Sequence, residues 1–155
     1  QAKENGVTPL LIASDKGHLE IARLLLEVGA AVDRAMSDGT TPLSAASFNG
    51  EIECARLLLE AGAAVNQADA GGFTPLYVAC QEGHPEVAQL LLEASASVGQ
   101  ADKDGVTPLF IASQEGRPEC ARLLLEASAA VNQALDNGVT PLYIACERGQ
   151  LECVQ

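Results

Sequence analysis

Apolar residues in this chain follow a helical spacing that returns, almost unchanged, every 33 residues. The tripeptide Thr-Pro-Leu marks each copy, and it begins at Thr8, Thr41, Thr74, Thr107 and Thr140. In the fourth copy, Thr107 is suited to cap a helix, and Pro108 to occupy its first turn. The pattern predicts a short first helix from Pro108 to about Glu115, ended by Gly116 in the left-handed conformation.

A second amphipathic helix follows in each copy. In the fourth copy it is predicted from near Pro118 to near Ser128, because its apolar residues have the i, i+3, i+4, i+7 spacing of one buried face: Cys120, Leu123, Leu124 and Ala127. The loop that follows carries one valine per copy, which we expect to be buried: Val32, Val65, Val98 and Val131. Loop tips such as Asp104-Gly105 predict a tight β-turn or hairpin.

The fixed period predicts a stack of units, none of which buries its apolar face alone. The expected fold class is an all-α repeat protein, a solenoid of helix-turn-helix units joined by β-turn or hairpin loops. Residues 1–155 form one expected domain, with repeats at about 6–38, 39–71, 72–104 and 105–137 and a partial repeat at 138–155. The core is expected to be aliphatic, because 48% of residues are hydrophobic and only 3% are aromatic.

These motifs resemble the ankyrin repeat, whose signature is Gly-x-Thr-Pro-Leu-His-x-Ala, then a Gly between the helices, then Leu-Leu-Leu-x-x-Gly-Ala. The chain reads GVTPLLIA, GTTPLSAA, GFTPLYVA, GVTPLFIA and GVTPLYIA, with RLLLEVGA, RLLLEAGA, QLLLEASA and RLLLEASA after them. The resemblance covers essentially the whole chain. It implies L-shaped repeats, helices in two layers and a concave surface that binds proteins.

Two departures from the signature have structural consequences. The histidine is absent from all five copies, where its position is held by Leu11, Ser44, Tyr77, Phe110 and Tyr143. The three aromatic replacements are expected to stack along the array. The terminal glycine of the second helix, present as Gly29 and Gly62, becomes Ser95 and Ser128. A left-handed conformation costs a non-glycine residue about 1–2 kcal/mol, so these two repeats are expected to be weaker.

The charge restricts the classes of partner. A net charge of −12 and a pI near 4.4 repel phosphate backbones and anionic lipid surfaces, so we expect neither a nucleic-acid nor a membrane partner. Nine of the 21 acidic residues form two columns, a column being the equivalent position in successive repeats: Glu20, Glu53, Glu86, Glu119 and Glu152, and Glu27, Glu60, Glu93 and Glu126. We interpret them as solvated helix faces, with an electrostatic docking surface as the alternative.

No catalytic, metal or cofactor site is indicated. The five cysteines have no zinc-site spacing and share columns with small or apolar residues, so we expect buried, free thiols: Cys54, Cys80, Cys120, Cys146 and Cys153. Free thiols favour a reducing, intracellular location, the cytoplasm. His18 and His84 share a variable column with Glu51, Arg117 and Gln150, which does not form a ligand set. We therefore expect no metal, no cofactor and no enzyme.

Candidate binding residues are those at which the copies differ on the surface. The first group is at the turn tips: Ser37, Asp38, Thr40, Ala70, Phe73, Lys103, Asp104, Val106, Asp136, Asn137 and Val139. The second is at the ends of the first helices: Asp15, Lys16, Phe48, Asn49, Gln81, Glu82, Gln114, Glu115, Glu147 and Arg148. Phe48 and Phe73 stand out as exposed aromatic anchors. They predict a protein–protein interaction module; the alternative is a structural or regulatory spacer within a larger protein.

The two ends of the array carry their own expectation. The last unit repeats the internal core pattern but stops at Gln155, a few residues into its second helix, and Gln1 to Gly6 enter an ordinary repeat. We expect a fragment of a longer array, a covering neighbour or end-to-end self-association of copies. A designed consensus array stays open as an origin, although Ser95, Ser128 and Gly99 look like natural drift.

Overall fold

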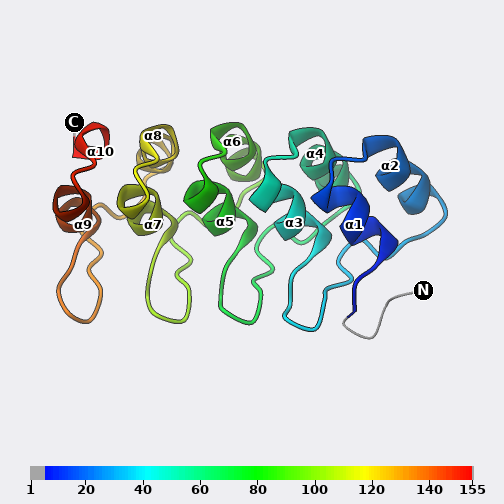
Figure 1. The fold of residues 1–155 in the computed structure, drawn as a ribbon, viewed down its shortest axis with the longest axis horizontal. Helices are drawn as coiled ribbons and strands as arrows, with labels where there is room; N and C mark the ends of the chain where they lie inside the picture. Colours follow the sequence, from blue (N-terminus) through cyan, green and yellow to red (C-terminus); the bar gives the residue numbers. More distant parts are fainter. Residues whose placement is uncertain (1–5, 155) are drawn as a thin grey trace.

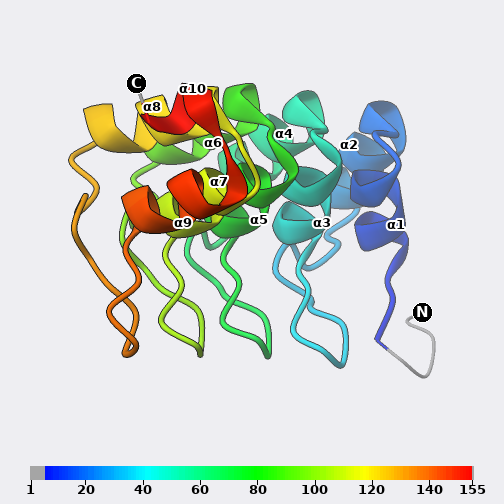
Figure 2. The same ribbon diagram turned by 60° about the vertical axis from the view of Figure 1, so that its left-hand side comes forward.

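The computed structural model describes residues 6–154, and in this range it consists of helices arranged in pairs. The pairs are α1 (Pro9–Asp15) with α2 (Leu19–Glu27), α3 (Pro42–Asn49) with α4 (Ile52–Glu60), α5 (Pro75–Glu82) with α6 (Pro85–Glu93), α7 (Pro108–Gln114) with α8 (Pro118–Glu126), and α9 (Pro141–Arg148) with α10 (Leu151–Val154). The first helices form one layer, the second helices form another, and the loops project from one side (Figures 1 and 2). The predicted all-α repeat solenoid is confirmed.

Each first helix begins as the sequence predicts, at a threonine cap followed by proline. Thr107 Oγ1 accepts a hydrogen bond from the N–H of Phe110 at 3.2 Å, and the equivalent threonine does the same in every other repeat. A cap of this kind contributes about 1 kcal/mol. The short first helices, of seven or eight residues, therefore have a fixed starting point.

Each nine-residue second helix is followed by a left-handed residue, as expected. Gly29 and Gly62 have φ angles of 84° and 85°, and Ser95 and Ser128 have φ angles of 66° and 67°. The two serines thus adopt a conformation that glycine adopts without strain.

The core is a continuous stack of leucine and alanine. It includes one leucine from each of the first four first helices and one from each of three second helices, all at most 4% exposed: Leu10, Leu43, Leu76 and Leu109, and Leu58, Leu91 and Leu124. Alanines at 0% exposure, such as Ala55 and Ala88, allow the helices to approach closely. Buried serines satisfy their hydroxyls within the helix, as Ser47 does by donating to the carbonyl of Leu43 at 2.7 Å.

Neighbouring repeats are also joined by a recurring side-chain hydrogen bond. His84 Nε2 donates to the carbonyl of Phe48 at 3.0 Å, and Arg117 Nε donates to the carbonyl of Gln81 at 3.0 Å. Gln150 Nε2 makes the same bond at 3.3 Å, again to a residue 36 positions earlier. Three members of the column that looked variable in the sequence therefore share a role as donors to the preceding repeat. Glu51, its member in the second repeat, has no hydrogen to donate when ionised.

The loops are joined by a second series of hydrogen bonds. Asp33 Oδ1 accepts from the N–H of Ala64 at 3.0 Å, and Asn66 Oδ1 accepts from the N–H of Ser97 at 2.8 Å. The next residue in this column is Gly99, which has no side chain to continue the series.

Three expectations about buried residues are wrong in the last unit and the loop before it. Val131 is 52% exposed, whereas Val32, Val65 and Val98 pack partly buried against the core. Cys146 is exposed and Cys153 is partly exposed, whereas Cys54, Cys80 and Cys120 are buried. The reason is that α10 has four residues instead of nine, so within residues 6–154 no complete second helix covers these side chains.

The expected aromatic stack also differs from the structure. Tyr77 and Phe110 are 4% and 3% exposed, but Tyr143 is 57% exposed. The ring that contacts Tyr77 is Phe73 of the preceding turn, with centroids 4.9 Å apart. A first-helix aromatic therefore packs against its own repeat's turn.

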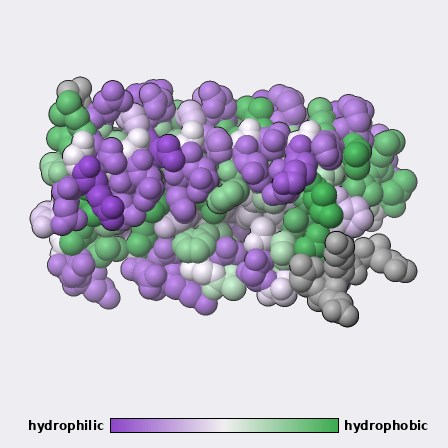
Figure 3. Space-filling view, in the orientation of Figure 1, coloured by the Kyte–Doolittle hydropathy of each residue, from purple (hydrophilic) through white to green (hydrophobic). Residues whose placement is uncertain are grey.

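Apolar residues are exposed at both ends of the described array. They include Ile12, Ile21, Leu24 and Val28 at one end and Leu142, Tyr143, Leu151 and Val154 at the other. Figure 3 shows apolar side chains over α1 and α2 beside a largely hydrophilic surface. In internal repeats a neighbouring unit covers the equivalent positions, as for Cys54, which is 1% exposed and occupies the position of Ile21. The residues Gln1 to Asn5 and Gln155 lie outside the described range.

Candidate functional site

A groove of about 410 Å³ crosses the first helices of the first three repeats. We call it the α3 groove. Side chains of α1, α3 and α5 line it together with residues of two turns: Leu11, Asp15, Met36, Thr40, Ser44, Ala45, Phe48, Asp69, Phe73, Val78 and Gln81. Its volume lies in the range of cavities that bury small ligands, and its lining is mostly apolar with a few polar groups, as is typical of binding sites.

The groove exists because the second repeat has small residues where the other repeats have large ones. Ser44 belongs to the column of Leu11, Tyr77, Phe110 and Tyr143, and Ala45 to the column of Ile12, Val78, Ile111 and Ile144. Ser44 and Ala45 are themselves buried, at 6% and 5% exposure, so the missing volume lies directly above a closed core. The hollow is therefore a feature of this repeat and not of the architecture.

Phe48 is the exposed aromatic side chain of the groove. It is 50% exposed, and the other members of its column are polar: Asp15, Gln81, Gln114 and Glu147. Its backbone is held by the neighbouring repeat, since its carbonyl accepts the 3.0 Å bond from His84. Phe48 is therefore an apolar contact on a fixed support, as expected of an interface anchor.

The description of Phe73 as a freely exposed anchor is wrong. Phe73 is partly buried, packs against the core and contacts the ring of Tyr77. Its N–H donates to Asp69 Oδ1 at 3.0 Å, which closes the turn. Phe73 forms a wall of the groove, so its truncation is expected to reduce stability as well as binding.

Two carboxylates lie in the lining. Asp69 Oδ1 accepts from the N–H groups of Gly71 at 2.8 Å and Phe73 at 3.0 Å, so both bonds use one of its two oxygens. Asp15 Oδ1 accepts from Asn49 Nδ2 at 2.9 Å, and its Oδ2 pairs with Lys16 Nζ at 2.9 Å. The bond to Asp15 raises the pKa of Lys16. Asp15 is thus already paired, whereas Asp69 has an oxygen that the turn does not use.

None of the predicted binding residues is buried, but the structure brings only some of them together. Asp15, Thr40, Phe48, Phe73 and Gln81 meet in the α3 groove. Seven are at the turn tips outside the groove: Ser37, Asp38, Ala70, Lys103, Asp104, Asp136 and Asn137. The rest are elsewhere along the array: Lys16, Asn49, Glu82, Val106, Gln114, Glu115, Val139, Glu147 and Arg148.

Sequence reasoning missed six of the lining residues: Leu11, Met36, Ser44, Ala45, Asp69 and Val78. A search for surface differences overlooks positions where a core column becomes small. The pair Ser44-Ala45 in GTTPLSAA was the available signal, because both residues are smaller than their equivalents in the other four repeats.

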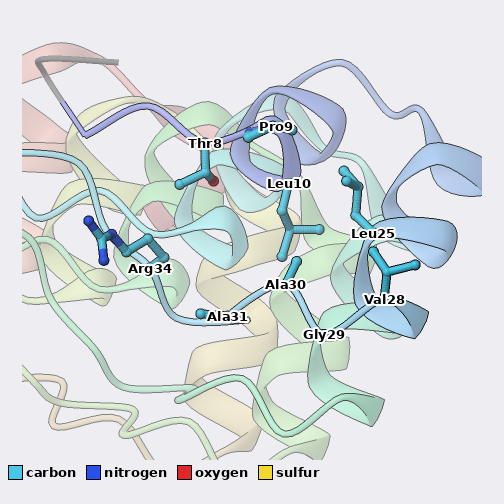
Figure 4. A pocket seen from close by; sticks show the side chains of 9 residues that line it. All are labelled: Thr8, Pro9, Leu10, Leu25, Val28, Gly29, Ala30, Ala31 and Arg34. Atoms are coloured by element: carbon cyan, nitrogen blue, oxygen red, sulfur yellow. The ribbon is translucent and has the colours of Figure 1, made fainter. Parts of the chain in front are cut away.

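A second hollow, of about 440 Å³, lies at the first repeat between α1, α2 and the following loop (Figure 4). Its lining is Thr8, Pro9, Leu10, Leu25, Val28, Gly29, Ala30, Ala31 and Arg34. It contains none of the predicted binding residues, and Arg34 is its one charged side chain. The α3 groove is the better candidate, because it combines an anchor with several polar groups.

The thiols and charged groups of the described residues were candidates for a metal site or a reactive thiol. Within residues 6–154, no group of three His, Cys, Asp or Glu side chains is placed to hold a metal ion. Burial raises the pKa of the Cys54 thiol, and a hydrogen bond with Cys120 together with burial raises that of Cys80. The raised values disfavour the reactive thiolate at Cys54 and Cys80, whereas the hydrogen bond with Cys80 lowers the pKa of Cys120.

Stacked helix pairs with a groove across the first helices define a repeat solenoid. The family described as ankyrin repeats (3 copies) matches residues 1–69, 32–102, 64–134 and 95–155, so the chain belongs to the ankyrin-repeat family. Arrays of this family are generally protein-interaction modules and are typically non-catalytic. No curated protein matches the sequence. Within residues 6–154, the helices are too short and too polar to cross a bilayer.

Proposed function

We propose that this chain is a non-catalytic module that binds a protein partner through the concave face formed by its turn tips and first helices. The observation that carries the proposal is the α3 groove, in which half-exposed Phe48 stands beside about 410 Å³ of unfilled space. The other exposed groups of this face, at the turn tips and helix ends, would form the polar rim of the interface.

The groove suits binding because its parts are already held in place. His84 fixes the carbonyl of Phe48, and Asp69 fixes the turn that carries Phe73. A partner would therefore pay little ordering entropy at these positions, and rigid surfaces retain more of their contact energy as affinity.

Binding through the groove is tested by truncating its anchor. After the partner has been captured from a lysate of the source organism, its affinity is measured for the unmodified chain, for Phe48→Ala and for a control, Leu125→Ala. Leu125 is 45% exposed on α8, close to the 50% of Phe48, but lies outside the groove. We expect Phe48→Ala to weaken binding by at least about 1 kcal/mol, or about fivefold, as for interface anchors.

The control variant should bind normally, and both variants should unfold at nearly the same temperature. If Leu125→Ala weakens binding and Phe48→Ala does not, the second-helix face is the interface and the proposal is wrong. If neither partner nor effect is found, the alternative of a structural or regulatory spacer gains support.

Two further properties belong to this proposal. We infer a reducing, cytoplasmic environment, because the buried thiols of Cys54, Cys80 and Cys120 are free and occupy core positions.

Copies would also stack end to end through exposed apolar residues such as Val28 and Leu151, leaving the groove free. Intact-mass measurement without reductant tests the first inference, and sedimentation over a range of protein concentrations tests the second.

A further inference from the structure

The α3 groove has a chemical preference that follows from its walls and its charge. We propose that it takes an apolar side chain from a protein segment in which a lysine or arginine lies next to that side chain, the basic residue pairing with carboxylates at the groove's edge. The inference rests on the proposed function and adds the class of segment that is recognised.

The floor and walls select for an apolar side chain. The floor is Ala45 with Ser44, and the walls include Met36, Phe48 and Val78. The hydroxyl of Thr41 donates to that of Ser44 at 3.3 Å, so the polar atom in the floor is already bonded. An apolar side chain gains about 25 cal/mol per Å² on entry, and the flexible methionine adjusts to its shape.

The edge of the groove selects for positive charge. Asp38 is next to Asp69, because the carbonyl of Asp38 accepts from the N–H of Ala70 at 2.7 Å. The following turn is next to that of Asp69, since the N–H of Lys103 donates to the carbonyl of Gly71 at 3.1 Å. We call the acidic residues of these turns the acidic rim; they are Asp38, Asp69, Asp102 and Asp104.

Within the acidic rim, the turn favours the charged form of Asp38. The N–H of Thr40 bonds to Asp38 and lowers the pKa of that carboxyl. Among the described residues, the basic groups nearby are Lys103, which is exposed among the rim residues, and Lys16, which is paired with Asp15. Carboxylates outnumber them, and the chain as a whole carries −12, so a basic segment is attracted and an acidic one is repelled.

The other repeats lack this combination. Equivalent space at the third and fourth repeats is filled by Tyr77 and Phe110, which are 4% and 3% exposed. Gln81 and Gln114 take the place of Phe48 there. One apolar site beside a row of carboxylates is therefore expected, rather than a repeated series of equal sites.

The preference is tested with a phage library of random dodecapeptides, selected against the whole chain immobilised at low salt. We expect enrichment of Leu, Ile, Met or Phe next to Lys or Arg, and binding that weakens as NaCl is raised. Selected peptides are then labelled and titrated against the unmodified chain and four variants by fluorescence polarisation.

Three variants alter the site, and one is a control. Ser44→Tyr fills the groove with the residue found at this position in the third repeat. Phe48→Gln replaces the anchor with the glutamine of the third repeat. Each variant should weaken peptide binding at least tenfold. Asp69→Asn keeps the hydrogen-bond acceptor for the turn but removes the negative charge. This variant should weaken peptide binding two- to fivefold and reduce the salt dependence of binding. Ser97→Tyr adds the same bulk at an exposed loop position outside the groove and the predicted interface, and should leave binding unchanged.

Circular dichroism confirms that each variant is folded, and Phe48→Gln keeps the test decisive if Ser44→Tyr fails to fold. The proposal is overturned if no peptide is enriched, if enriched peptides are acidic or lack apolar residues, or if they bind both groove variants as tightly as the unmodified chain. Those results would leave the proposed function intact if Phe48→Ala still weakens binding of the captured partner. If Phe48→Ala does not weaken binding of the captured partner, the proposed function itself is overturned.

Discussion

Replacing Gly99 with asparagine should restore a missing connection between the third and fourth repeats. In the first two loops, an Asp33 or Asn66 side chain accepts a hydrogen bond from the backbone N–H located 31 residues later, at 3.0 and 2.8 Å. The equivalent donor for Gly99 is Ala130. A Cβ at Gly99 would meet no atom within 4 Å, and its φ is not in the left-handed region, so a side chain is accommodated.

Two variants at position 99 separate the effect of adding a side chain from the effect of adding the hydrogen bond. Gly99→Ala adds no hydrogen bond and should stabilise the fold by about 0.4–1 kcal/mol, because it restricts the unfolded chain. Gly99→Asn should add to this the net value of one hydrogen bond, about 0.5–1.5 kcal/mol. The difference between the asparagine and alanine variants, about 1 kcal/mol, is therefore the value of the new connection.

Urea unfolding followed by circular dichroism measures this difference, provided that the slope of the transition is unchanged. Hydrogen exchange gives a local measurement, since the amide of Ala130 should become more protected only in the asparagine variant. The reverse change, Asn66→Ala, should cost a similar free energy and expose the amide of Ser97. The reasoning is refuted if asparagine and alanine at position 99 give equal stability and equal exchange at Ala130.

Three other outcomes are expected. Ser128→Gly should stabilise the chain by about 0.5–1 kcal/mol, because relief of the left-handed strain exceeds the cost of the greater conformational entropy of the unfolded chain. The reverse change, Gly62→Ser, should destabilise the chain, and thermal unfolding measures both effects. Glu51→Gln should stabilise the junction of the first two repeats by about 1 kcal/mol, since an amide donates to the carbonyl of Asp15 as Gln150 donates to Gln114; equal urea midpoints would argue against this. Iodoacetamide at neutral pH should modify exposed Cys146 before Cys54, whose burial raises its thiol pKa, and peptide mass mapping gives the order.

The sequence was sufficient for the features that depend on near neighbours along the chain. Helix starts follow from a threonine and a proline within one turn, as at Thr107 and Pro108, and the left-handed end at Ser128 follows from its place after an amphipathic helix. These interactions join residues three or four positions apart, so they recur wherever the local pattern recurs. The 33-residue period then places the repeats in a stack.

Tertiary structure decided the features that depend on contacts between repeats. The α3 groove is space left by small Ser44 and Ala45 and bounded by Met36 and Phe73 of different turns, so only the packed arrangement shows that these residues meet. Phe73 is half-buried because Tyr77 packs against it, and local pattern alone suggested an exposed ring. Burial and unfilled volume depend on the side chains of neighbouring repeats, about 30 residues away in sequence, and a local pattern does not contain that information.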